Sequence, residues 1–103
     1  MKILEAPLEF EWDGGNQNKN LKLHGVSDQE CEEVFFDSQR RMLNDVLHSG
    51  SEERIILIGQ TKKERLLFVV FTLRGHKVRV VSARDLNKKE RILYEKKSST
   101  SKI

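Results

Sequence analysis

The strongest hydrophobic pattern in the chain is an uninterrupted apolar run over residues 66–71. Six large apolar side chains in a row leave no polar face, so this run predicts a strand that is buried on both faces. Residues 77–84 alternate basic and apolar side chains, which is typical of a strand with one face in water. Gly75 lies between these segments, where a hairpin loop needs a permissive backbone. We therefore predict a pair of antiparallel strands over 65–74 and 77–84.

Shorter patterns predict two more strands. Residues 8–13 alternate apolar with acidic side chains, which indicates a half-buried strand. Residues 54–59 form another apolar run, and the polar residues 60–64 then predict a hairpin loop. Over 37–51 the apolar periodicity is weak and Ser, Asn and Gly recur, which indicates a loop with local helix. We thus expect a three-stranded antiparallel meander formed by residues 54–59, 65–74 and 77–84.

Two helices are predicted between the first strand and residue 37. Asp13 is expected to cap a helix over 16–24, in which Leu21 contacts the core and after which Gly25 ends the helix. Residues 27–30 read Ser-Asp-Gln-Glu, a capping box that begins a second helix. Helical spacing predicts that this helix buries a stripe formed by Cys31, Val34 and Phe35.

A closing helix is predicted over 86–97, with Leu86 and Leu93 on its core face. Residues 98–103 form a polar tail that we expect to be frayed. The sequence therefore predicts one α+β domain over 1–97. It consists of a small antiparallel sheet, made of the N-terminal strand and the meander, packed with two N-terminal helices and the C-terminal helix.

The net charge of +3 conceals an uneven distribution. Residues 1–50 hold 10 acidic and 5 basic side chains, whereas residues 51–103 hold 6 acidic and 14 basic ones. A basic half favours a polyanionic partner, although lysines such as Lys88 and Lys89 also serve simply to solvate a surface. No apolar run approaches the roughly 20 residues that cross a bilayer, and Cys31 has no partner for an internal disulfide. We expect a cytoplasmic protein with no membrane partner.

Several chemistries are not indicated. The three histidines, His24, His48 and His76, lie in unrelated contexts without metal-ligand spacing, so no zinc site is predicted. Gly14-Gly15 lacks the lysine and spacing of a phosphate-binding loop, and no nucleophile elbow occurs. The sequence predicts no cofactor.

A cationic cluster remains in the C-terminal half, with nearby groups able to transfer protons. Arginine can bind two phosphate oxygens at once and stays charged at any working pH. Such a cluster suits RNA cleavage by the 2′-hydroxyl, because it would stabilise the extra negative charge of the transition state. Histidine, glutamate and tyrosine are all eligible as acid or base. We predict catalytic roles for His24, Arg84, Glu90, Arg91 and Tyr94, and RNA-binding roles for Arg65, Arg74, Lys77, Arg79, Lys88 and Lys89.

Structural roles are open for the same residues. Glu90 can pair with Tyr94 or a neighbouring arginine and so support the helix. His24 can act as a capping cation at a helix C-terminus. Arg84 can lock the fold by bonding backbone carbonyls or Asp45. The sequence does not decide between these roles and catalysis.

Short motifs occur along the chain from about Phe10 to Tyr94. They include Phe10-Glu11-Trp12-Asp13, His24-Gly25-Val26, Val34-Phe35, Arg65-Leu66-Leu67, Phe71-Thr72, Ser82-Ala83-Arg84 and Glu90-Arg91. In the order and spacing of these motifs, the chain resembles the BrnT family, small ribonuclease toxins of bacterial type II toxin–antitoxin pairs that are related in fold to RelE toxins.

The resemblance implies a ribonuclease that stops translation and is neutralised by an antitoxin, and with the cationic cluster it leads us to expect cleavage without a metal ion. That antitoxin is typically a ribbon-helix-helix protein, which binds operator DNA and so would link the toxin to it indirectly. We expect the toxin to form either a homodimer or a heterotetramer with the antitoxin. This chain departs from the family pattern where relatives usually carry lysines, at Asn16 and Leu23. The alternative is therefore a toxin-like module that binds an antitoxin or nucleic acid without cleaving.

Overall fold

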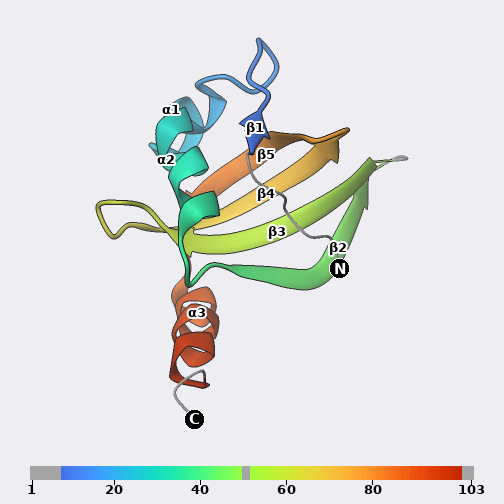
Figure 1. Cartoon of the computed structure of the whole chain (residues 1–103). Helices are drawn as coiled ribbons and strands as arrows, with labels where there is room; N and C mark the ends of the chain where they lie inside the picture. Colours follow the sequence, from blue (N-terminus) through green and yellow to red (C-terminus); the bar gives the residue numbers. More distant parts are fainter. Residues whose placement is uncertain (1–7, 50–51, 101–103) are drawn as a thin grey trace.

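The protein is an α+β fold built on one twisted sheet (Figure 1), and this computed structural model describes residues 8–49 and 52–100. The sheet order is β1-β5-β4-β3-β2. Helices α1 and α2 lie near one another beside the sheet, and α3 extends away from the end of β5 (Figure 1). The elements are β1 Glu9–Phe10, α1 Lys19–His24, α2 Asp28–Glu33, the 3-10 helix η1 Val34–Phe36, β2 Arg41–Ser49, β3 Glu52–Gln60, β4 Leu66–Arg74, β5 Lys77–Asp85 and α3 Lys88–Thr100.

Strands β2 to β5 form an antiparallel meander. This confirms the predicted three-stranded meander, which corresponds to β3, β4 and β5. In the β4–β5 hairpin Arg74 pairs with Lys77, and Gly75 has a φ of 63°, so the turn uses a left-handed backbone that glycine adopts at little cost. Strand β1 instead pairs parallel with β5, with Glu9 opposite Lys77. The N-terminal strand therefore departs from the antiparallel arrangement expected from the sequence. It covers the edge of β5 that β4 leaves open.

The prediction of a loop with local helix over 37–51 is wrong for residues 41–49, which form strand β2. The backbone of β2 pairs with β3 from Arg41 to Leu43 and again from Leu47 to Ser49, with a register shift between the two stretches. A shift of this kind interrupts the period-two alternation by which a strand is found in a sequence. The strand lies at the edge of the sheet, so only one of its sides must pair.

The main core lies between the sheet and the α2–η1 segment. The predicted stripe of Cys31, Val34 and Phe35 is buried there, and the predicted capping box is present between Ser27 and Glu30. The ring of Phe35 packs edge-to-face on Phe71 with centroids 5.0 Å apart. Burial raises the pKa of the Cys31 thiol to about 12, so this cysteine is a core side chain.

A smaller cluster lies where α3 leaves the sheet, formed by Ile58, Leu86 and Tyr94. The predicted core face of α3 is only partly correct, since Leu86 is buried but Leu93 is 37% exposed. The helix begins at Lys88, after Leu86, so helical spacing counted from Leu86 did not apply. The helix also continues to Thr100, past the predicted end at 97; residues 101–103 of the predicted tail lie outside the described residues.

Helix α1 is anchored by a polar side chain instead of the predicted leucine. Leu21 is 49% exposed, whereas Asn20 is 1% exposed and its Oδ1 accepts a hydrogen bond from the Ala83 amide at 3.0 Å. Asp13 does not cap this helix, which begins at Lys19; its Oδ1 accepts from the Gly15 amide in the preceding loop. Gly25 ends the helix as predicted, with a φ of 69°. No helix in the described part of the chain is long and apolar enough to cross a membrane.

Candidate functional site

The predicted cationic cluster is divided between the two ends of β5. The strand has nine residues, so its terminal Cα atoms lie about 26 Å apart at about 3.3 Å per residue. We call these the Lys77 end and the Asp85 end. The Lys77 end carries Arg74, Lys77 and Arg79, and the Asp85 end carries Arg65, Arg84, Lys88, Lys89 and Arg91.

Acidic side chains of the β1 segment neutralise the arginines at the Lys77 end. Arg79 donates to both carboxylate oxygens of Asp13 at 2.9 and 3.0 Å, and to Glu11 at 3.3 Å. Arg74 also approaches Glu11, at 3.6 Å. The hydrogen bonds from Arg79 hold the pKa of Asp13 below its ordinary value. Lys77 is exposed at the start of the strand.

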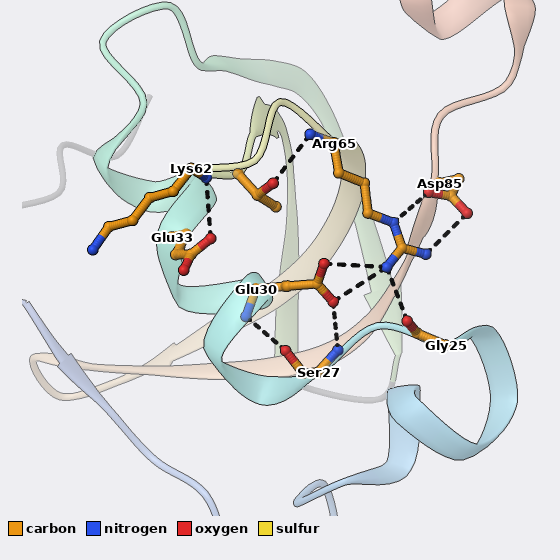
Figure 2. Close-up of polar contacts among 8 residues, drawn as sticks. Gly25, Ser27, Glu30, Glu33, Lys62, Arg65 and Asp85 are labelled. Atoms are coloured by element: carbon orange, nitrogen blue, oxygen red, sulfur yellow. Dashed lines mark hydrogen bonds and ion pairs between the residues drawn. The ribbon is translucent and has the colours of Figure 1, made fainter.

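Arg65 joins three segments at the Asp85 end (Figure 2). Its Nε and Nη2 atoms donate to the two carboxylate oxygens of Asp85 at 2.7 and 3.1 Å. Its Nη1 donates to the Gly25 carbonyl at 2.9 Å and lies 3.2 Å from both oxygens of Glu30. The guanidinium group therefore connects the end of β5 to the α1–α2 junction, and all of its nitrogens are used for this purpose.

Asp85 lies within electrostatic reach of residues from both α1 and α3. The pKa of Asp85 is lowered chiefly by the hydrogen bonds from Arg65, and the positive charges of Arg91 and His24 lower it further. His24 is the last residue of α1, and Arg91 lies in the first turns of α3. Both side chains are exposed, so they lie within electrostatic reach of one carboxylate and open to solvent.

Arg84 forms a bidentate ion pair with Glu90, at 2.8 and 2.9 Å. The guanidinium group also lies over the ring of Phe68, 4.0 Å from its centroid, and donates to the Asp85 carbonyl. The hydrogen bonds from Arg84 lower the pKa of Glu90, so this carboxylate is ionised at neutral pH. Two structural roles considered for the sequence are thus observed: Glu90 pairs with an arginine, and Arg84 bonds a carbonyl.

Tyr94 faces the interior. Its hydroxyl donates to Asp37 Oδ2 at 2.7 Å, and the same carboxylate oxygen accepts from the Gln60 amide at 2.8 Å. Burial, together with this hydrogen bond, raises the pKa of the phenol. Tyr94 therefore ties α3 to β3 and the segment after η1, away from the exposed cations.

The Asp85 end leaves exposed cations on α3, and the exposed His24 of α1 lies within electrostatic reach of the same carboxylate, Asp85. Lys88, Lys89 and Arg91 on α3 are exposed and have no ion pair within residues 8–49 and 52–100. This is an arrangement that can bind a phosphodiester and shift a proton next to it. In the same ranges, no three His, Cys, Asp or Glu side chains gather into a group that could hold a metal ion.

Sequence reasoning missed the carboxylates that organise this end. Asp85 follows Arg84 directly, in the most basic stretch of the chain, and this isolated acidic residue was the available signal. Glu30 was identified only as part of a capping box. Nothing in the sequence pattern marked Asp37 as the partner of Tyr94.

One five-stranded sheet packed with helices, with exposed cations on α3 and an exposed histidine that act on the same carboxylate, is typical of a small α+β protein that can bind a polyanion. The comparisons with known proteins agree with this class. The chain matches the BrnT_toxin family, described as the ribonuclease toxin BrnT of a type II toxin-antitoxin system, over residues 12–90. The chain belongs to the BrnT family of ribonuclease toxins, which implies an RNA target and an antitoxin partner. No curated protein matches the chain.

Proposed function

We propose that the protein is an endoribonuclease whose cleavage site is the Asp85 end of β5. His24 takes the proton from an RNA 2′-hydroxyl, and the 2′-oxygen attacks the adjacent phosphorus. The bond to the 5′-oxygen breaks, and that oxygen takes a proton from solvent. The products are a 2′,3′-cyclic phosphate and a 5′-hydroxyl. Because histidine titrates near neutral pH, it suits this proton transfer better than an arginine-bound carboxylate.

The cations have complementary roles in this proposal. Arg91 and the guanidinium group of Arg84 stabilise the charge that develops on the phosphoryl oxygens. Lys88 and Lys89 bind the neighbouring phosphates. Glu90 is a positioning residue that fixes Arg84 through its bidentate pair. Since these side chains supply the positive charge, we propose that cleavage proceeds without a metal ion.

One observation supports this choice of site above the others. His24 from α1, Arg91 from α3 and Arg65 from β4's leading loop all act on the pKa of Asp85 at the end of β5. Segments that are distant in the sequence therefore converge on one exposed region. The Lys77 end has no such convergence, because its arginines are paired with Glu11 and Asp13.

The test uses the purified protein, free of antitoxin, with single-stranded RNA in EDTA. We expect cleavage with 2′,3′-cyclic or 3′-phosphate ends, and His24→Ala should slow it at least about 100-fold. His76→Ala is the matched control, because His76 is an exposed histidine at the Lys77 end, paired with Glu9. Intact RNA at high protein excess would refute the catalytic proposal. Equal losses from both variants would refute the choice of site.

A second candidate is a toxin-like module that binds without cleaving. It is favoured by the engagement of Arg65 and Arg84, whose guanidinium groups are already bonded to carboxylates. It predicts that the protein retains RNA or its antitoxin but leaves RNA intact under every condition of the cleavage assay. Growth arrest that His24→Ala abolishes in a stably folded protein would argue against it.

For the biological setting, we propose that RNA cleavage in the cytoplasm inhibits translation and that a ribbon-helix-helix antitoxin neutralises the toxin. The antitoxin would also connect the pair to operator DNA, as a heterotetramer or around a toxin dimer. The family membership supports the antitoxin but not its type. Co-expression with the product of the neighbouring reading frame, followed by measurement of the mass of the complex, tests both the partner and the stoichiometry.

A further inference from the structure

A surface hollow lies beside α1, the helix that ends at His24. It has a volume of about 390 Å³, and its lining comes from the loop after β1 and from α1. This volume is in the lower part of the range of small-ligand sites, roughly 300–1,000 Å³. We call it the α1 hollow; it is lined by Gly14, Gly15, Gln17, Lys19, Lys22 and Leu23.

The lining offers a complementary group for each part of one nucleotide, the phosphate and the base. Lys19 and Lys22 are exposed and have no ion pair in the part of the chain that the structure describes. Lysine binds phosphate as a point charge. Leu23 is 64% exposed and offers an apolar surface to a base, while the Gln17 amide can donate to and accept from a base edge.

A buried asparagine fixes the loop that lines the hollow. Asn16 is 3% exposed, and its Nδ2 donates to the carbonyls of Glu11 and Val80, at 2.9 and 3.2 Å. Its Oδ1 accepts from the Asp13 amide at 2.8 Å. Because these bonds attach the loop to the backbones of the β1 segment and β5, the hollow is preformed and requires little ordering when a ligand enters.

The residues that line the hollow include two lysines and no acidic side chain, and Asp13 in the preceding loop is paired with Arg79. Gly14 leaves space, since a Cβ built there would meet nothing within 4 Å. The α1 hollow is therefore open, cationic and accessible from solvent.

The position of the hollow connects it to the proposed cleavage site. Lys22 and Leu23 directly precede His24, and the six residues of α1 rise about 7.5 Å from Lys19 to His24. A single strand that crosses this short helix would pass from the hollow to His24 within about one nucleotide.

We propose that the α1 hollow binds one nucleotide of a single-stranded RNA beside the scissile phosphate, with Lys19 and Lys22 on the backbone phosphates and the base against Leu23. The choice of RNA as the ligand rests on the proposed function. The subsite would determine how the substrate strand is aligned with His24.

The test measures binding separately from cleavage. A fluorescent 2′-O-methyl oligonucleotide lacks the 2′-hydroxyl nucleophile, so its anisotropy reports binding alone. Replacing both lysines (K19A/K22A) should weaken binding about tenfold. It should also reduce the slope of log affinity against log salt by about 1.4, since each single-strand phosphate contact contributes about 0.7. The matched control is K62A/K63A, which removes two exposed lysines from the β3–β4 loop and should leave both quantities near wild type.

A neutral variant separates shape from charge. Gly14→Phe should fill the hollow and weaken binding about tenfold. Because it removes no phosphate contact, it should leave the slope of log affinity against log salt near the wild-type value. Gly14→Ala should bind like wild type. Thermal melts confirm that each variant is folded.

Several results would overturn the subsite: no binding by wild type, equal losses in the two double-lysine variants, or full binding by Gly14→Phe. A wild type that binds the 2′-O-methyl strand but never cuts RNA would instead preserve the subsite and remove the ribonuclease proposal. Normal cleavage with unchanged binding in every hollow variant would preserve the ribonuclease proposal and remove the subsite.

Discussion

The two ends of β5 carry the same kinds of basic residue in different settings. At the Lys77 end, Glu11 and Asp13 pair with the arginines and leave little free charge. At the Asp85 end, Arg65 and Arg84 are also paired, but the exposed cations of α3 add charge that no ion pair within the described residues neutralises. The difference shows that a count of cations does not identify a phosphate site. The carboxylates that the fold brings to each cation decide which charges are available.

The largest expected effect is a difference in RNA cleavage rate between variants at the Asp85 end and at the Lys77 end of β5. Arg91→Ala should lower the rate of RNA cleavage about 100-fold, because it removes an exposed cation from the proposed site of charge development. Lys77→Ala removes an equal charge from the other end of the strand and should change the rate by less than about twofold. Both rates are measured under single-turnover conditions in low salt.

The two Arg91 and Lys77 variants should melt within a few degrees of wild type, since neither side chain forms an ion pair in the described ranges. Equal rate losses would mean that the ends act alike toward RNA, and the distinction between them would be lost. The reverse order of rates would transfer the cleavage site to the Lys77 end.

A second effect compares the paired arginines by stability. Arg65→Ala should lower the free energy of unfolding by about 2 kcal/mol, because it leaves Glu30 and Asp85 without their cation and the Gly25 carbonyl without a donor. Arg79→Ala should lower it less, since Arg79 bonds the carboxylates of Asp13 and Glu11 but, among the described residues, no backbone carbonyl. Urea titrations at neutral pH measure both values, and a larger loss from Arg79→Ala would contradict the assignment of Arg65 as the main tie.

How much of this was predictable depends on the range of each signal. The β4–β5 hairpin and the capping box at Ser27 are local patterns, and both were found from the sequence. Strand β2 was missed because its register shift breaks the alternation over residues 41–49. Asn20 was missed as an anchor because its partner, the Ala83 amide, is 63 residues away in the chain.

The site was predictable in composition but not in pairing. Arg84, Glu90 and Arg91 are near neighbours in the sequence, so their association was expected. The partners of Arg65 lie 20 and 35 residues away, and periodicity carries no information about such contacts. The division of the cluster between two ends of one strand likewise follows from the length of β5. Basic residues that are close together in the sequence lie at opposite ends of this extended strand.

A third effect concerns acid. The pKa values of Asp85 and Glu90 are lowered in the folded protein, chiefly by hydrogen bonds from Arg65 and Arg84. For Glu30, burial alone would raise the pKa, but bonds from Ser27 and Arg65 outweigh it and the net shift is downward. A lowered folded pKa contributes stability above the unfolded value, and this contribution is lost as the pH falls through the folded value. Stability should therefore decline below about pH 4.5 and be fully present at neutral pH.

Arg65→Ala should make that decline shallower, since Glu30 and Asp85 would then titrate nearer their ordinary values. Urea midpoints at about pH 7 and about pH 3.5 measure the difference, and Lys77→Ala, whose side chain forms no ion pair within the described residues, serves as the control from the other end. An acid dependence that Lys77→Ala removes and Arg65→Ala leaves intact would reverse the comparison.

The smallest expected effect tests Tyr94 within the Asp85 end. Tyr94→Phe keeps the ring in the small cluster with Ile58 and Leu86 but removes the hydroxyl that donates to Asp37. Asp37 still accepts the Gln60 amide, so the free energy of unfolding should fall by only about 1 kcal/mol. The cleavage rate should stay within about twofold of wild type, because a phenol with a raised pKa that is bonded to a carboxylate is not offered to a substrate. A rate loss of about 100-fold with unchanged stability would instead make Tyr94 the proton carrier, and His24 would then be the residue with a structural role.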